Sequence, residues 1–493
     1  MDIKRCSGLI LHPTSLPSKY GIGDFGNSCF NFLDLLYDSK TTLWQVLPLG
    51  ITDEVEYSPY SSKSSILGNP YLISLDEFEK EIKNKKLLID LQSLQQDEVN
   101  FKNVYEIKNQ IFMDLSKNLD LTDNAIKNFL NKKLIKEHII FKTLSDVFKV
   151  NWTEWEQEYL TYSLDLYNHV IKNFPNEFKF NVFTQYQFDL QWKKVKAYAN
   201  SKNIKILGDI PIYVNHNSAD VWLNKNLFDL DKNFKMSFVS GAVPDAFTTE
   251  GQIWGTALYN WDNHYEENYS YWIDKLNILL ESYDFLRIDH FVGFFQYWAI
   301  PNGESALNGH WRNGPWKSFF EIVAQKVPFE RLLAEDLGVE LEITDQILKQ
   351  YNIPGMLLLE QRIPNEDGSE EIDPDFWDEN YAAYTGTHDS PTIKQWLENA
   401  NDIQLKYFKK YSENLKTKFD EDVWNFISLI WSTPSKLAIT TAQDLLELGA
   451  DSRFNVPGTV DGNWKWRLKS LDLLEIPLTN ISKLNILYGR ANN

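Results

Sequence analysis

Three acidic residues each stand at the end of a short apolar run: Asp289, Glu335 and Asp389. Runs of this length and apolarity are typical of buried parallel strands. In α/β barrels, the residues that follow such strands lie together at one loop face. Three carboxyl groups delivered to one face would suit chemistry on a glycosidic bond, which needs one ionised and one protonated carboxyl group.

The surroundings of the three acids predict a different role for each. Arg287 lies two residues before Asp289 on the same strand and therefore on the same face, so its guanidinium should favour the ionised carboxylate. The longer side chain of Glu335 suits the proton donor. Asp389, which follows a histidine, could bind sugar hydroxyls and favour an oxocarbenium-like ring. Asp336 should point to the opposite face and serve structure.

Other interpretations of these residues remain open. An Arg-x-Asp on a strand also fits a buried ion pair, and a Glu-Asp pair also fits a solvated helix start. A metal site is a further alternative, because His12, His216, His290 and His388 fall at or just beyond predicted strand ends. Neither His-x-His nor His-Glu-x-x-His occurs, so neutral imidazoles that donate to sugar hydroxyls are the favoured interpretation.

Eight apolar runs recur along the chain, with helical patterns such as 183–199 between many of them. Alternating strands and helices predict an α/β fold with parallel pairing and right-handed crossovers. Eight such units predict a (β/α)8 TIM barrel that forms a single catalytic domain over residues 1–493. The runs span residues 8–12, 43–49, 204–209, 285–289, 331–335, 356–360, 382–389 and 437–444.

Uneven spacing between the runs locates two insertions. Residues 77–180 are rich in Lys, Glu, Asn and Leu and show helical periodicity, which predicts a mostly helical insertion between the second and third strands. Residues 215–283 contain glycines among aromatic residues, which predicts an insertion with an active-site loop after the third strand.

Composition excludes several classes of function. A net charge of −20 and a pI near 4.9 argue against nucleic acid and anionic membranes as partners. No apolar run approaches the ~20 residues of a membrane span. The 2 cysteines cannot form a disulfide framework, and the N-terminal region lacks a secretory apolar segment. We therefore expect a cytoplasmic protein.

Several strings, in order, resemble the 4-α-glucanotransferase family, also called amylomaltase or disproportionating enzyme (glycoside hydrolase family 77). The resemblance covers nearly the whole chain apart from the helical insertion. The chain departs from the family pattern at Val55–Tyr57, Val243, Thr256, Ala257 and Val292, and none of these positions is one of the three acids. The strings that carry the resemblance are 11–17, 21–26, 44–50, 58–60, 68–70, 208–214, 251–255, 287–291, 334–338, 387–389, 443–444, 457–459 and 463–464.

The resemblance implies a barrel with inserted subdomains and no C-terminal β-domain. It also implies a retaining two-step transfer in which Asp289 is the nucleophile, Glu335 the acid and then the base, and Asp389 the stabiliser of the transition state. It implies no metal and no organic cofactor. Residues implied to bind substrate are Arg287, His290, His388, Tyr60, Asp209, Asp245, Gln252, Trp254 and Asn463.

The expected partners are a maltodextrin or other α-1,4-glucan donor and a glucose or maltodextrin acceptor, with the protein a monomer or homodimer. Hydrolysis at the same carboxyl groups is the nearest alternative, because the two reactions differ in how water is excluded. A non-catalytic glucan-binding barrel is a second alternative, and a metal-dependent hydrolase is a third.

Overall fold

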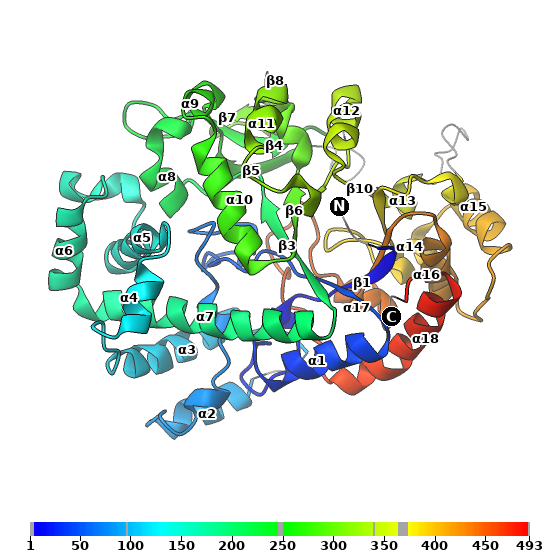
Figure 1. Ribbon diagram of the computed structural model, residues 1–493, viewed down its shortest axis with the longest axis horizontal. Coiled ribbons are helices and arrows are strands. Elements are labelled where there is room, and N and C mark those ends of the chain that lie inside the picture. Colours follow the sequence, from blue (N-terminus) through cyan, green and yellow to red (C-terminus); the bar gives the residue numbers. More distant parts are fainter. Residues whose placement is uncertain (1–3, 95–96, 245–249, 339–340, 363–372, 492–493) are drawn as a thin grey trace.

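Eight short parallel strands form one sheet at the centre of the molecule, in the order β10-β11-β12-β1-β2-β3-β6-β9 (Figure 1). The computed structural model describes residues 4–491 except 95–96, 245–249, 339–340 and 363–372. Every predicted run contributes one strand, which confirms the barrel. The strands are β1 Cys6–Ile10, β2 Leu43–Gln45, β3 Lys205–Pro211, β6 Phe285–Asp289, β9 Leu332–Ala334, β10 Gly355–Leu358, β11 Tyr381–Tyr384 and β12 Leu437–Thr441.

The join between β9 and β10 closes the barrel without a regular ladder. The backbone N–H of Ala334 donates to the carbonyl of Pro354 at 2.9 Å. The backbone N–H of Met356 donates to the Asp336 carboxylate at 2.7 Å. Asp336 therefore has the structural role expected of it, because its side chain stands in for a strand carbonyl at this join.

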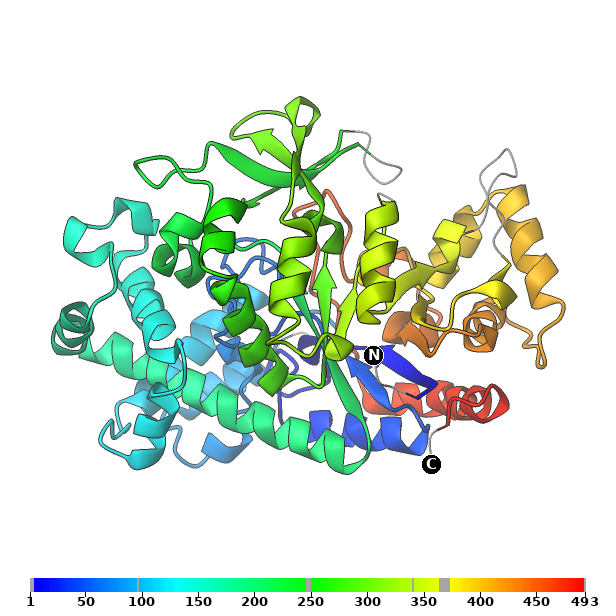
Figure 2. The same ribbon diagram turned by 45° about the horizontal axis from the view of Figure 1, so that its top comes forward.

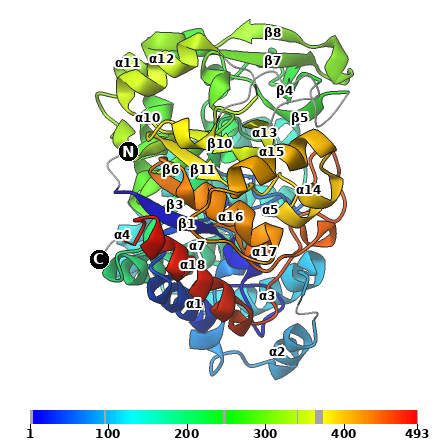
Figure 3. The same cartoon turned by 90° about the vertical axis from the view of Figure 1, so that its right-hand side faces the viewer.

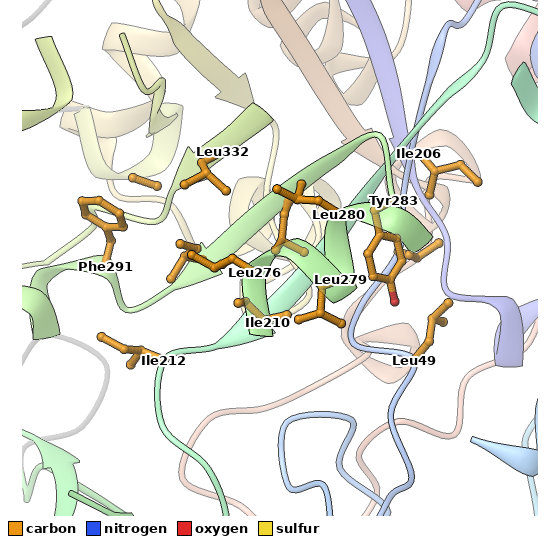
Figure 4. Packing of buried hydrophobic residues seen from close by; sticks show 14 of the residues in the cluster. Leu49, Ile206, Ile210, Ile212, Leu276, Leu279, Leu280, Tyr283, Phe291 and Leu332 are labelled. Carbon is orange, nitrogen blue, oxygen red and sulfur yellow. The ribbon is translucent and has the colours of Figure 1, made fainter. Parts of the chain in front are cut away.

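Side chains of the barrel strands alternate between an inner and an outer layer. Leu207, Phe285 and Met356 belong to an inner cluster that fills the barrel. Outward-facing residues pack beneath the helices. Figure 4 shows Leu276, Leu279 and Leu280 of α10 against Ile206 and Ile210 of β3. Burial of such a side chain stabilises the fold by about 1.5–3 kcal/mol.

Helices surround the barrel and fill the predicted insertion between β2 and β3. The longest is α7, whose 27 residues include the predicted helix 183–199 and begin at a proline, the residue best suited to a first helical position. The helices are α1 Asn27–Asp38, α2 Lys85–Gln92, α3 Phe101–Ser116, α4 Asn124–Leu130, α5 Ile135–Phe148, α6 Leu164–Asn173, α7 Pro175–Ser201, α8 Ala219–Leu223, α9 Trp261–Glu266, α10 Ser270–Ser282, α11 Trp316–Val323, α12 Glu342–Tyr351, α13 Leu359–Arg362, α14 Ile393–Asn399, α15 Asp402–Ser412, α16 Asp422–Ser432, α17 Ala442–Leu445 and α18 Glu475–Leu487.

A second, antiparallel sheet lies beside the barrel, in the order β5-β4-β7-β8. Sequence patterns did not predict it. It joins the segment after β3 to the segment after β6, and Figure 2 shows it above the barrel strands. Its members are β4 Phe238–Ala242, β5 Gln252–Ala257, β7 Gln296–Pro301 and β8 His310–Asn313.

The described chain after β12 consists of helices and loops and adds no strand, as expected for a barrel without a C-terminal β-domain. The last helix, α18, packs beside α1 (Figure 3), and Arg490 after it donates to the Cys6 carbonyl of β1 at 3.1 Å. Within the described residues, no helix is both long enough and apolar enough to cross a membrane.

Candidate active site

The inner face of β6 carries the first acid and its arginine. Phe285, Arg287 and Asp289 alternate along the strand, so all three point into the barrel. The Arg287 guanidinium donates to Asp289 at 2.8 Å, which confirms the predicted pair. The same guanidinium donates to both carboxylate oxygens of Asp209, at 2.9 and 2.7 Å.

Strand register explains why Asp209 shares this arginine. Asp209 on β3 lies directly opposite Arg287 on β6, and opposite residues of neighbouring strands are close enough to interact. The Arg287 side chain is only 3% exposed. Burial alone would lower the pKa of Arg287, but the two carboxylates raise it well above its ordinary value. Arg287 is thus a fixed cation between two anions.

Glu335 follows β9 and rests against the backbone that leaves β6. One carboxyl oxygen accepts from the backbone N–H of His290 at 2.6 Å, and the other accepts from Leu337 at 2.9 Å. Burial, followed by the negative charge of Asp289, raises the pKa of Glu335 to about 8. Arg287 and the two N–H donors oppose this rise. The carboxyl group is therefore protonated at neutral pH, as a proton donor must be.

Asp389 lies in a loop and not at the end of a strand, which corrects the predicted run 382–389. Strand β11 ends at Tyr384. The carboxylate contacts His388 Nε2 at 3.0 Å and accepts from the Asn455 amide at 2.6 Å. Burial would raise the pKa of Asp389, but His388 and Asn455 lower it to about 2. Burial likewise opposes the charged form of His388, yet Asp389 raises the pKa of its imidazole.

Tyr60 connects the Asp389 side of the site to the Arg287 side. Its hydroxyl donates to Asp209 at 2.7 Å and lies 3.4 Å from Nδ1 of His388. The Tyr60 and His388 rings are stacked, with centroids 4.9 Å apart. A continuous set of contacts therefore runs from Asp289 through Arg287, Asp209 and Tyr60 to His388 and Asp389, and Glu335 borders it through the backbone N–H of His290.

His290 and the small sheet border this cluster. His290 adopts a left-handed backbone conformation, with a φ of 54°, and burial lowers its pKa to about 4, which keeps the imidazole neutral. Trp254 of β5 meets the His290 ring edge-on at 4.7 Å. Its indole N–H donates to Gln252 at 3.2 Å. The structure therefore brings His290, Trp254 and Gln252 to the edge of the carboxyl cluster.

One of the predicted substrate-binding residues, Asn463, bonds to its own loop, and another, Asp245, cannot be compared. The Asn463 amide is engaged with Val456 and Thr459 of its own loop, at 3.0 Å and 2.9 Å. These contacts shape the segment that carries Asn455, so Asn463 supports the site from behind. Asp245 lies outside the described residues.

Asn455 is a site residue that the sequence patterns did not single out. It lies in a loop with no periodicity, two residues before the Pro-Gly-Thr string that carries part of the family resemblance. Its neighbour Arg453 donates to the Asp389 carbonyl at 2.7 Å. The position of Asn455 and Arg453 just before the string 457–459 is only a weak indication of a role in the site. The fold is needed to show that both side chains contact Asp389.

The donor set fits glycoside chemistry and does not fit a metal site. Across the described parts of the chain, no group of three or more His, Cys, Asp or Glu side chains could hold a metal ion. The anionic carboxylates are instead paired with Arg287 and His388. A neutral carboxyl group close to paired carboxylates can donate a proton while a carboxylate attacks or stabilises a cationic carbon.

Comparisons with known proteins agree with this chemistry. A sequence model of the 4-alpha-glucanotransferase family matches residues 11–473. A 4-alpha-glucanotransferase of Aquifex aeolicus is 37% identical, over 99% of this chain and 99% of the relative. That of Clostridium butyricum is 36% identical, over 98% and 100%. Amylomaltase from Streptococcus agalactiae, solved in complex with acarbose, superposes with a TM-score of 0.91 at 33% identity and covers 99% of this chain and 100% of its own.

Proposed function

Because the chain belongs to the 4-alpha-glucanotransferase family, we propose that Asp289, Glu335 and Asp389 carry out its reaction. That reaction moves an α-1,4-glucan segment from a donor to the 4-hydroxyl of an acceptor. The observation that supports this assignment is that contacts through Arg287, Asp209, Tyr60 and His388 join Asp289 to Asp389, while Glu335 accepts from the backbone N–H of His290, the residue after Asp289. Hydrolysis and non-catalytic glucan binding are not favoured, because the full-length relatives are transferases.

In the first step, an Asp289 carboxylate oxygen attacks the anomeric carbon of the donor. The bond between this carbon and the glycosidic oxygen breaks, and Glu335 gives its proton to the leaving oxygen. The ion pair with Arg287 holds the attacking carboxylate in place. The shortened donor leaves with its new hydroxyl, and a glucosyl ester remains on Asp289.

In the second step, Glu335 acts as the base. Formation of the ester removes the negative charge of Asp289, and that charge is one of the causes that raise the pKa of Glu335. The pKa of Glu335 therefore falls in the intermediate, which suits a carboxylate that must now accept a proton. The acceptor 4-hydroxyl attacks the anomeric carbon, loses its proton to Glu335 and releases Asp289, so the configuration is retained.

Asp389 stabilises the positive charge that develops on the sugar ring in both steps. Its contacts with His388 and Asn455 fix its position, and a pKa of about 2 keeps it anionic over the working range of pH. We assign sugar binding to Arg287, His290, His388, Tyr60, Asp209, Gln252 and Trp254, together with Asp245. No step of this scheme uses a metal or an organic cofactor.

The substrates we propose are a maltodextrin donor and a glucose or maltodextrin acceptor. The solved amylomaltase of Streptococcus agalactiae, with acarbose bound, supports a site for glucan-like molecules. We further propose that 77–180 and 215–283 act as insertions on one catalytic domain. Both cysteines are free and buried, which suits a reducing compartment, and we propose that the protein works in the cytoplasm as a monomer or homodimer.

Incubation with maltotriose tests the function directly. Transfer converts maltotriose into glucose and a ladder of longer maltodextrins, which thin-layer or anion-exchange chromatography resolves. Glucose and maltose with no longer product would show hydrolysis and would overturn the proposal. Binding of maltotriose with no new products would show a non-catalytic glucan-binding protein. Activity that survives treatment with a chelator would exclude a metal-dependent hydrolase.

A further inference from the structure

The loop that carries Asp389 has little support from regular structure. Strand β11 ends at Tyr384 and helix α14 begins at Ile393, so Asp389 stands in the middle of the connection. Beside the loop lies a small cavity of about 30 Å³, whose lining includes Thr387, His388 and Ser390 of the loop itself. Most of the loop is nevertheless buried, with His388 only 6% and Ser390 only 8% exposed. Polar contacts between side chains and backbone hold Asp389 in this buried, irregular segment.

Those polar contacts come from two other strand ends. Ser390 Oγ donates to a Glu360 carboxyl oxygen at 2.8 Å, and Glu360 stands two residues after β10. From the loop after β12, Arg453 donates to the Asp389 carbonyl at 2.7 Å. The backbone N–H of Asn455 donates to the His388 carbonyl at 3.1 Å. The loop is thus held on one side through Ser390 and on the other through Arg453 and Asn455.

Glu360 acts on both of these attachments. It accepts the Ser390 hydrogen bond. Its negative charge, like that of Asp389, also favours the charged form of the Arg453 guanidinium and raises its pKa against the effect of burial. The charged groups that act on Glu360 are Asp444 of α17, which disfavours its ionised form, and Arg453, which favours it. Glu360 itself makes no contact with Asp289 or Glu335 in any described hydrogen bond or ion pair, so it stands outside the network of the three acids.

We propose that Glu360 is a positioning residue for glucan transfer, and that its carboxylate acts through Ser390 and Arg453 to hold the loop that presents Asp389 to the sugar ring. This inference rests on the proposed role of Asp389. The ionised form of Glu360 accepts the Ser390 hydrogen bond more strongly than the neutral form does, and its charge also favours the nearby guanidinium of Arg453. The rate of transfer should therefore respond to the protonation of a carboxyl group that never touches the substrate.

The electrostatics give that response a direction. Burial, with a smaller contribution from Asp444, raises the pKa of Glu360 to about 7 against the opposing effects of Ser390 and Arg453. Glu360 is then protonated below about pH 7 and ionised above it. We expect kcat to rise as the pH increases through about 7, up to the pH at which Glu335 begins to lose its proton.

The test is the pH profile of kcat for maltotriose in Glu360→Gln. The glutamine keeps an oxygen to accept from Ser390, but it lacks the negative charge that strengthens this hydrogen bond and attracts Arg453. We expect kcat at pH 8 to fall about tenfold, since a charged partner contributes more than a neutral one, and the rise near pH 7 to disappear. Glu360→Asp should restore part of that rise. A purely structural role would lower the melting temperature and leave the shape of the profile unchanged.

Glu447→Gln is the matched control. Glu447 also accepts a single side-chain hydrogen bond, from the Trp424 indole at 2.9 Å, and it should keep the parent profile. A parent-like profile in Glu360→Gln would overturn the proposal. If that variant fails to fold, Ser390→Ala decides instead, and an unchanged kcat there would overturn it.

Two further measurements separate this proposal from the proposed function. Maltotriose disproportionation by the parent protein and its loss in Asp389→Asn establish the site. If both hold and Glu360→Gln behaves as the parent does, only the positioning role is wrong. If the parent forms no ladder, or if Asp389→Asn stays fully active, the proposed function fails and the positioning role fails with it.

Discussion

Each end of the barrel holds a buried arginine, and the two arginines are satisfied in opposite ways. At the carboxyl ends of the strands, Arg287 is paired with the carboxylates of Asp209 and Asp289. Near the amino ends of β1 and β12, Arg490 donates to the main-chain carbonyls of Trp431, Cys6, Lys436 and Thr433. The two carboxylates raise the pKa of Arg287 well above its ordinary value, whereas burial lowers that of Arg490 well below it.

This difference separates a residue with a proposed role in the reaction from a residue that stabilises the fold. Arg287 positions the Asp289 carboxylate, the proposed nucleophile. The negative charge is thereby held where the anomeric carbon would become positive. Arg490 binds carbonyls of two segments that are distant in sequence, Cys6 and 431–436, and fixes the end of the described chain to the barrel. Substitutions at the two ends should therefore have different signatures: loss of rate at one end and loss of stability at the other.

The largest expected effect is at the carboxyl end, in Asp289→Asn. The variant cannot form the glucosyl ester, so kcat on maltotriose should fall by about 10⁴-fold or more, as losses of covalent nucleophiles do. The melting temperature should change little, because Arg287 keeps Asp209 as a partner. Binding of maltotriose, measured by calorimetry, should persist. Substantial turnover in this variant would refute Asp289 as the nucleophile.

A smaller loss is expected in Glu335→Gln. Removal of a general acid should lower kcat on maltotriose by about 10²–10⁴-fold. The defect should be much smaller with α-maltosyl fluoride as donor, because fluoride leaves without receiving a proton from the enzyme. Initial rates with the two donors provide the measurement. An equal loss with both donors would mean that Glu335 does not act as the acid.

At the opposite end, Arg490→Met should change stability and not rate. The substitution removes the Arg490 hydrogen bonds to four carbonyls, three of which keep Arg5 or the Cys6 N–H as a donor, and we expect the free energy of unfolding to fall by about 3 kcal/mol. Urea denaturation measures this change, and kcat per folded molecule should stay at the parent value. Lys483→Met, an exposed change on α18, is the control and should be neutral. A lower kcat in Arg490→Met with an unchanged free energy of unfolding would contradict the proposed difference between the two ends of the barrel.

The smallest effect concerns pH in the unmodified protein. Glu335 acts as an acid only while it is protonated, and its pKa is about 8. The rate of transfer from maltotriose should therefore fall as the pH rises through about 8, by about tenfold for each further pH unit. The fall should be absent with α-maltosyl fluoride when formation of the glucosyl ester limits the rate. A rate that keeps rising above pH 9 would contradict the assignment.

The sequence predicted the barrel well because its strands are short, apolar and buried on both faces. Every predicted run contains a strand, and Asp289 and Glu335 stand where the runs placed them. The run that ends at Asp389 extends too far, because β11 ends at Tyr384 and the following residues, 385–388, are small or polar residues of the loop. Local pattern therefore located the acid but not the loop that holds it.

What could not be predicted depends on pairing between distant segments. The antiparallel sheet joins β4 to β7, and no local pattern states that these strands meet. The register that places Asp209 opposite Arg287 is also a property of the assembled barrel. Asn455 and Glu360 were missed for the same reason, because each is linked to the site only through contacts with the loop that carries Asp389, which is distant from both in sequence.

The join between β9 and β10 determines where the barrel opens first. Strand β6, which carries Asp289, has a regular ladder on each side, with β3 and with β9. At the join, by contrast, the Asp336 carboxylate takes the place of a strand carbonyl. Local unfolding begins where backbone hydrogen bonds are fewest, so amide exchange should be faster at Met356 than along β6. Transient opening at this join would then displace Glu335, the proposed proton donor, before it disturbs Asp289, the proposed nucleophile.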